Sequence, residues 1–121
     1  MERVVKSGTG WRVGWNPHVA KYQALIGTDD WAIELTSAEF HDFCRLAVQL
    51  TEAIAQISQE LMDEEKISCE AESDLVWMEV TGYPHAYSLH FILHTGRGVE
   101  GTWTPQAVPH LIQAVQMIQV F

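Results

Sequence analysis

The stretch TSAEFHDFCRLAVQLTEAIAQISQELM, residues 36–62, has the most regular pattern in the chain and decides its fold. Its apolar side chains recur in steps of three and four residues, which places them along one stripe of an α-helix. Thr36, followed three residues later by Glu39, is the pattern of a capping box at a helix start. We expect one long helix whose stripe is buried in the core or, alternatively, at a dimer seam. The stripe consists of Phe40, Phe43, Ala47, Leu50, Ile54, Ile57 and Leu61.

Short segments of alternating polarity on both sides of this helix predict β-strands, four before it and four after it. The expected strands cover residues 2–6, 11–15, 21–27, 31–35, 66–71, 74–82, 86–94 and 99–103. Thr104 predicts the cap of a second helix. Pro109 disfavours a regular helix through the preceding turn, so we expect a single turn over 105–108 and a main helix from Pro109. The apolar tail Val120-Phe121 is expected to pack against the protein.

The two halves of the chain resemble each other. The order of four strands and a helix occurs twice, and Thr36 and Thr104 occupy the same place in each copy. Gly14 is followed by Trp15, Asn16, Pro17 and His18, and Gly82 is followed by Tyr83, Pro84 and His85. We interpret the chain as a pseudo-duplicated α+β fold of antiparallel sheets and two helices, β4-α-β4-α. Each sheet needs a helix over its apolar face, and two such halves can cover each other.

Length and composition predict one domain over residues 1–121, with halves at roughly 1–62 and 66–121. Cys44 and Cys69 lie in apolar patterns and are expected to be buried thiols in a reducing compartment; a disulfide between them is the alternative. The first residues lack the apolar region of a secretory signal, and no apolar run approaches the ~18 residues of a membrane span. We therefore predict a cytoplasmic protein without a membrane partner.

The charge is negative overall but unevenly distributed. The formal net charge is −9, and the sequence pI is about 4.9. Taken whole, this acidity disfavours binding to nucleic acid. Residues 1–28 nevertheless hold four basic residues and one acidic residue, whereas the remainder holds three basic and fifteen acidic residues. This asymmetry indicates either a basic end on an acidic body or a chance distribution.

Three segments carry a resemblance to a known family. They are Gly8 to Pro17, Trp31 to Glu39 and Gly101 to Trp103. With them the chain resembles a small family of uncharacterised proteins from cyanobacteria and plant plastids, domain of unknown function 1818. The resemblance implies a fold similar to the Whirly and single-stranded-DNA-binding transcriptional regulator proteins. It implies no activity and no functional residues, and the basic lysine-rich motif of Whirly proteins is missing, so DNA binding does not follow from the fold.

The candidate motifs for catalysis, cofactors and metals are weak. Gly96 to Gly101 matches G-x-G-x-x-G, but Gly101 falls in an expected strand rather than in the helix that a dinucleotide site requires, so a hairpin turn is favoured. His90 and His94 are about 13 Å apart along a strand, too far for one metal ion. No nucleophile elbow is evident. We predict a protein that is not an enzyme and has no cofactor and no metal.

The remaining hypotheses are binding functions. The first is a protein–protein or self-association module, a homodimer or a complex with another protein, in which Trp77 is either an interface anchor or packed against a second layer. The second is single-stranded nucleic-acid binding through a basic, aromatic N-terminal sheet, which the net charge disfavours. The candidate nucleic-acid contacts are Arg12, Lys21, Trp11, Trp15 and Tyr22. Of the tryptophans, Trp11, Trp15, Trp31 and Trp103 share faces with apolar strand residues, which favours core positions for most of them.

Overall fold

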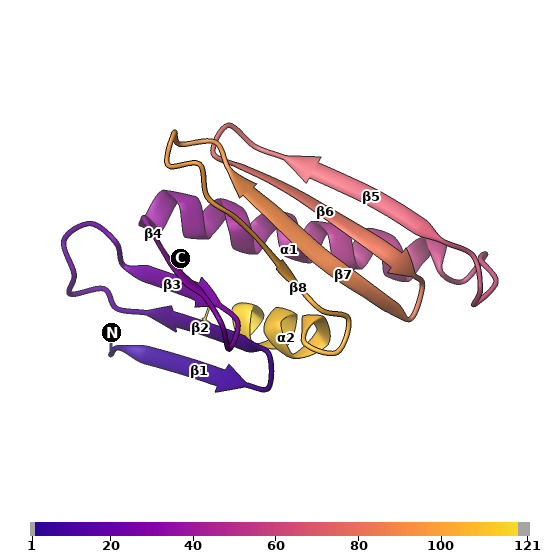
Figure 1. Ribbon diagram of the computed structural model, residues 1–121, viewed down its shortest axis with the longest axis horizontal. Helices are drawn as coiled ribbons and strands as arrows, with labels where there is room; N and C mark the ends of the chain where they lie inside the picture. The colour runs from indigo at the N-terminus through magenta and orange to yellow at the C-terminus, as the bar shows by residue number, and fades with distance from the viewer. Residues whose placement is uncertain (1, 119–121) are drawn as a thin grey trace.

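The computed structural model describes residues 2–118 and contains two antiparallel four-stranded sheets and two helices (Figure 1). The N-terminal sheet consists, in spatial order, of β1 (Val4–Gly8), β2 (Trp11–Trp15), β3 (Ala24–Gly27) and β4 (Ala32–Leu35), and α1 (Ser37–Ile57) follows it. The C-terminal sheet consists of β5 (Ile67–Glu72), β6 (Val76–Tyr83), β7 (Ala86–Leu93) and β8 (Glu100–Trp103), and α2 (Val108–Ile118) follows it. The α+β class and the order of elements are confirmed. The predicted packing of the tail Val120-Phe121 lies outside the described residues.

Each helix covers the sheet of the other half. α1 follows the N-terminal sheet in the chain but packs on β5 and β6, and α2 follows the C-terminal sheet but packs on β2 and β1. Figure 1 shows this exchange, with α1 running along the C-terminal sheet. Because both helices lie on inner sheet faces, the outer face of each sheet is open to solvent. Within residues 2–118, neither helix is long and apolar enough to cross a bilayer.

Most boundaries differ from the sequence-based prediction by one or two residues, and two differ by more. α1 ends at Ile57 rather than at residue 62; Ser58 is its C-cap, with its N–H donating to the Ile54 carbonyl and its hydroxyl donating to the Ala55 carbonyl. Ile57 is 40% exposed, so its assignment to the buried stripe was wrong. β3 begins at Ala24 rather than at residue 21, because the Asn16 N–H donates to the Gln23 carbonyl and closes the preceding segment as a loop.

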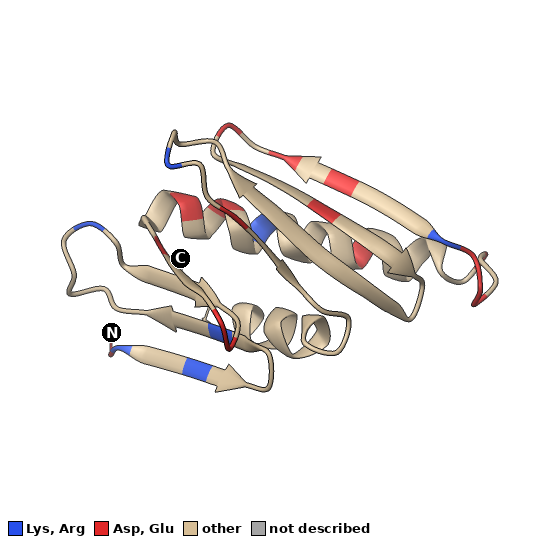
Figure 2. Ribbon diagram, in the orientation of Figure 1, with Lys and Arg blue, Asp and Glu red and all other residues tan. Residues whose placement is uncertain are grey.

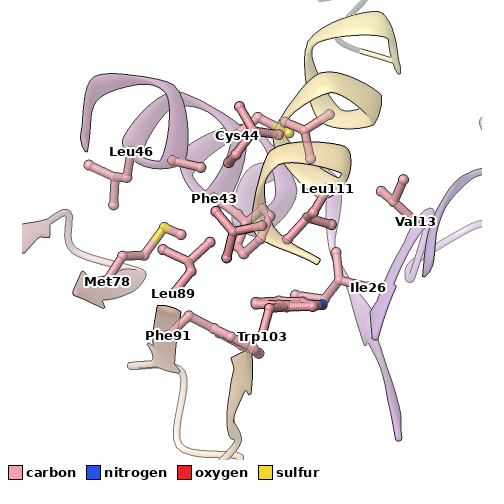
Figure 3. Close-up of a cluster of buried hydrophobic side chains, with 14 of the residues drawn as sticks. Val13, Ile26, Phe43, Cys44, Leu46, Met78, Leu89, Phe91, Trp103 and Leu111 are labelled. Atoms are coloured by element: carbon pink, nitrogen blue, oxygen red, sulfur yellow. The ribbon is translucent and has the colours of Figure 1, made fainter. Parts of the chain in front are cut away.

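Two tryptophans join the halves. The indole N–H of Trp103, on β8, donates to the carbonyl of Gly27, on β3, over 2.8 Å in the buried interior. Trp31, which precedes β4, lies against Gly101 of β8 so closely that a Cβ there would be 2.5 Å from the ring. Phe43 and Phe91 surround Trp103, with ring centroids 5.6 and 5.4 Å away (Figure 3). The centre of the core is therefore built from both halves.

A buried ion pair also connects the halves. Glu39 and Thr36 form the predicted capping box of α1, in which each side chain accepts from the other's backbone N–H. The same Glu39 carboxylate accepts a 2.7 Å hydrogen bond from Arg97, in the β7–β8 loop. Burial raises the pKa of Glu39, but the Thr36 N–H, Thr95 and Arg97 outweigh it and hold this pKa below its ordinary value. The sequence predicted the cap but not the arginine.

Replacing Trp103 should show how much its contact with Gly27 contributes to the free energy of unfolding. We expect Trp103→Phe to lower the free energy of unfolding by about 2–4 kcal/mol, because it leaves a cavity and an unpaired buried carbonyl at Gly27. Urea denaturation followed by circular dichroism measures the change. Trp77→Phe is the matched control, since Trp77 lies on an outer face, and it should cost less than about 1 kcal/mol. Equal losses in the two variants would contradict the assigned role of Trp103.

The lowered pKa of Glu39 predicts a dependence of stability on pH. Its ionised form stabilises the fold above the unfolded pKa of about 4.5, and this contribution is lost as the pH falls through the lower folded pKa. Glu39→Gln should therefore lower the unfolding free energy at neutral pH by about 2 kcal/mol, with the difference from wild type shrinking below that window. Thermal melts across pH would show this. Glu52→Gln, an exposed change on the same helix, should not alter the profile.

Candidate binding site

Figure 2 shows Lys and Arg concentrated on the N-terminal sheet and its loops, whereas Asp and Glu predominate on the C-terminal sheet and its turns. Basic residues lie on β1, β2 and the β2–β3 loop, and acidic residues lie on β5, β6, β8 and the neighbouring turns. On the open face of the N-terminal sheet the basic residues are Arg3 and Arg12, with Lys21 on the adjoining loop, and Glu34 is an acidic residue among them. Lys6 pairs with the buried Val13 and therefore lies on the other side of the sheet. The acidic set of the C-terminal sheet and its turns is Glu70, Glu72, Asp74, Glu79 and Glu100. The asymmetry in the sequence thus becomes a separation in space, with a basic N-terminal sheet and an acidic C-terminal sheet.

An apolar pair lies on the two central strands of the acidic face, near one end of both strands. Trp77 of β6 and Ile92 of β7 are directly opposite each other in the strand register, and both are half-buried. Glu72 on β5 and Glu100 on β8 stand at the two ends of the same row. We call the outer face of the C-terminal sheet, which includes this pair, the Trp77 face. Among residues 2–118, no helix or strand covers Trp77 from the outside, so packing beneath a second layer is not observed, and the role of interface anchor stays a prediction.

Two histidines, His90 and His94, lie beside glutamates of the Trp77 face. His90 packs edge-on against Trp77, with 5.8 Å between ring centroids, and shares a 2.7 Å hydrogen bond with Thr102. His94 pairs with Glu72 over 2.7 Å. Each histidine therefore has neighbours from an adjacent strand. Within residues 2–118, no three His, Cys, Asp or Glu side chains gather in a way that could hold a metal ion.

The predicted nucleic-acid contacts do not form one surface. Trp15 is 7% exposed and its ring stacks on Phe40, so a base could reach it only if α1 moved away. Trp11 is half-buried and packs against the core. Arg12 projects from the opposite face of β2, where it donates to the carbonyls of Thr28 over 2.8 Å and Trp31 over 3.1 Å. Arg12 therefore fixes the β3–β4 turn, a role that sequence reasoning missed.

Lys21 and Tyr22 lie together in the β2–β3 loop. The Lys21 ammonium is 5.1 Å from the Tyr22 ring centroid, and the Arg97 guanidinium is 5.0 Å from it. Arg97 also donates to the carbonyl of Glu34 over 2.8 Å. This arginine was read from the sequence only as part of a glycine-rich turn, and the pattern holds no signal of its long-range contacts.

A pocket of about 300 Å³ opens on the outer face of the N-terminal sheet. Gly14 forms its floor, and Val5 and Leu25, which flank Gly14 in the strand register, form two of its walls. Arg3 and Arg12 also line it. Tyr22, Val19, Asn16, Gln23 and Glu34 complete most of its rim. We call it the Gly14 pocket; in the sequence Gly14 was noticed only as a marker of the internal repeat.

The two cysteines are free thiols in different settings. Cys44 is buried in α1, and burial raises the pKa of its thiol to about 12, so it is a poor nucleophile at neutral pH. Cys69 is half-buried on β5. The expectation of buried thiols thus holds fully for Cys44 and in part for Cys69.

Comparisons with known proteins give a family but no activity. A search of curated proteins found no match. A crystal structure of a protein of unknown function from Prochlorococcus sp. NATL2A, described as a DUF155-family protein, is similar over 98% of this chain and 99% of that chain, with 25% sequence identity and a TM-score of 0.92. The model of the domain of unknown function DUF1818 matches residues 6–118. The chain therefore belongs to the DUF1818 family.

Proposed function

We propose that the chain is a non-enzymatic interaction protein that binds a protein partner through the Trp77 face. The observation that carries this proposal is the pairing of Trp77 with Ile92 on the two central strands of an open sheet face. Apolar side chains grouped on such a face stay in contact with water unless a partner covers them. Tryptophans surrounded by polar residues are frequent anchors of protein interfaces.

The charges around the pair define the chemistry of the partner. Glu72 and Glu100 end the row of Trp77, and Glu79 lies on the same face two residues along β6. A segment that presents an apolar side chain flanked by lysines or arginines would complement this arrangement. We propose no catalytic activity and no cofactor for the protein. We also propose a reducing, cytoplasmic location, which the two free thiols support.

A second copy of the chain has the required chemistry. The outer face of the N-terminal sheet exposes 60% of Val5, and Arg3 and Arg12 line the same face. Contact between the basic face of one copy and the acidic face of another would be heterologous, because two different patches meet. Self-association, as a homodimer or a longer assembly, is therefore the form of this function to test first.

Replacing Trp77 should weaken the association. We expect sedimentation velocity to show assemblies at low salt that dissociate as salt screens the charges. Trp77→Ala should weaken the assembly at least about tenfold, because the apolar anchor is lost. Ile57→Ala is the control, since Ile57 is an apolar residue, 40% exposed, at the end of α1 and away from the Trp77 face.

A monomeric wild type would redirect the test to another protein. Affinity capture with wild type and with Trp77→Ala would then be followed by reconstitution of the captured partner from purified components. If neither self-association nor reconstituted binding differs between the two, the Trp77 face is not the binding surface and the proposal fails.

Single-stranded nucleic-acid binding through the N-terminal sheet is the second candidate. The grouping of Arg3 and Arg12 on one open face, with Lys21 on the adjoining loop, favours it. The resemblance to Whirly proteins belongs to this proposal as well. The buried position of Trp15 and the acidic remainder of the chain weigh against it.

A charge reversal on the loop tests this candidate. If the function holds, filter binding of a single-stranded oligonucleotide should weaken steeply with salt, and Lys21→Glu should lower the affinity about tenfold because a phosphate contact becomes repulsive. Arg45→Glu is the matched control, since Arg45 is an exposed cation on α1. Equal affinities of the two variants would reject the N-terminal sheet as a nucleic-acid site.

A further inference from the structure

At position 14, unlike the positions of the other glycines, neither the backbone conformation nor a close contact requires a glycine. A Cβ at Gly14 would meet the carbonyl oxygen of Val4 at 3.6 Å, Val5 Cγ2 at 3.7 Å and Leu25 Cβ at 3.9 Å, all ordinary contacts. Each of the other seven of the eight glycines has a positive φ or a Cβ position that would overlap backbone or a ring. Those seven are Gly8, Gly10, Gly27, Gly82, Gly96, Gly98 and Gly101. A glycine inside a strand weakens the sheet, so Gly14 keeps a space open at a cost in stability.

The space that Gly14 leaves is the floor of the Gly14 pocket. Val5, Gly14 and Leu25 stand side by side on β1, β2 and β3, so a missing central side chain creates a hollow between two apolar walls. At about 300 Å³ the pocket is at the lower end of the range for small-molecule sites. An apolar group of modest size fits this floor.

The charges at the pocket favour an anion. Among residues 2–118, neither Arg3 nor Arg12 makes an ion pair. Arg12 uses two of its five N–H groups on backbone carbonyls, which hold the guanidinium in place without cancelling its charge. A fixed guanidinium loses little entropy when it binds a carboxylate or phosphate. Glu34 also lines the pocket, and it disfavours ligands with more than one acidic group.

We propose that the Gly14 pocket binds a small molecule with an apolar body and a single acidic group, a carboxylate or a phosphate. The apolar body lies over Gly14 between Val5 and Leu25, and the acidic group contacts Arg12 and Arg3. This site is separate from the Trp77 face, which lies on the other sheet, but Val5, Arg3 and Arg12 also belong to the basic face proposed for self-association, so a bound ligand would compete with that assembly.

Matched probes test the chemistry of the ligand. Naphthoate and naphthylmethanol have the same apolar body, but only naphthoate carries an acidic group. In ligand-observed NMR titrations we expect saturable binding of naphthoate and at least about tenfold weaker binding of naphthylmethanol, because the alcohol forms no charge-assisted hydrogen bonds. Naphthyl phosphate in the same titration distinguishes a phosphate site from a carboxylate site. Absence of saturable binding for both naphthoate and naphthyl phosphate overturns the proposal.

Matched variants test the location of the site. Gly14→Val fills the floor with a side chain that suits a strand, so it should weaken naphthoate binding about tenfold or more while the melting temperature stays the same or rises. Gly14→Ala, whose Cβ makes only ordinary contacts, should give a smaller loss and serves if the valine variant is unstable. Arg3→Gln should weaken binding, and Arg45→Gln, a change of an exposed arginine on α1, should not. Naphthoate binding that is unchanged in Gly14→Ala, Gly14→Val and Arg3→Gln overturns the proposal.

Discussion

The structure depends on the contact between two tryptophans of different halves and the glycines that face them. Trp103 donates its N–H to the carbonyl of Gly27, and the ring of Trp31 occupies the place where Gly101 has no side chain. Each contact joins the N-terminal sheet to β8. Within residues 2–118 the two sheets share no backbone hydrogen bonds, so these side chains, the contacts of Arg97 and the exchanged helices hold one sheet relative to the other.

The exchange of helices explains why both binding surfaces proposed above are sheet faces. A four-stranded sheet has two faces, and each helix can cover only one. Both helices lie in the interior, between or beside the inner faces, where the apolar strand residues meet Phe43 and Leu111 (Figure 3). The outer faces are therefore not covered by the helices, and most of their side chains can differ between the halves, although Arg12 on one of them fixes the β3–β4 turn. Their opposite charges and their different apolar centres are consistent with separate binding roles.

Local patterns predicted the elements well because their causes are local. The capping box at Thr36 and the alternation in β5, β6 and β7 depend on neighbours within a few residues, and all appear where the sequence placed them. Contacts between distant residues were not predictable in this way. The pairing of Arg97 with Glu39 joins residues 58 positions apart, and nothing in a glycine-rich turn indicates a buried carboxylate as its partner. The end of α1 was also missed, because the apolar pattern continues to Leu61 although the helix ends at Ile57.

The internal repeat shows where a sequence pattern and its physical cause separate. Gly14 and Gly82 correspond in the repeat, and the pattern alone assigns both the same role. In the structure Gly82 has a φ of +142°, and a Cβ there would lie 2.6 Å from the carbonyl oxygen of Ala86, so its turn requires glycine. Gly14 has neither constraint, and its glycine shapes the surface instead of the backbone. The two matching glycines therefore have different roles: the backbone requires Gly82, whereas on our proposal Gly14 makes room for a ligand.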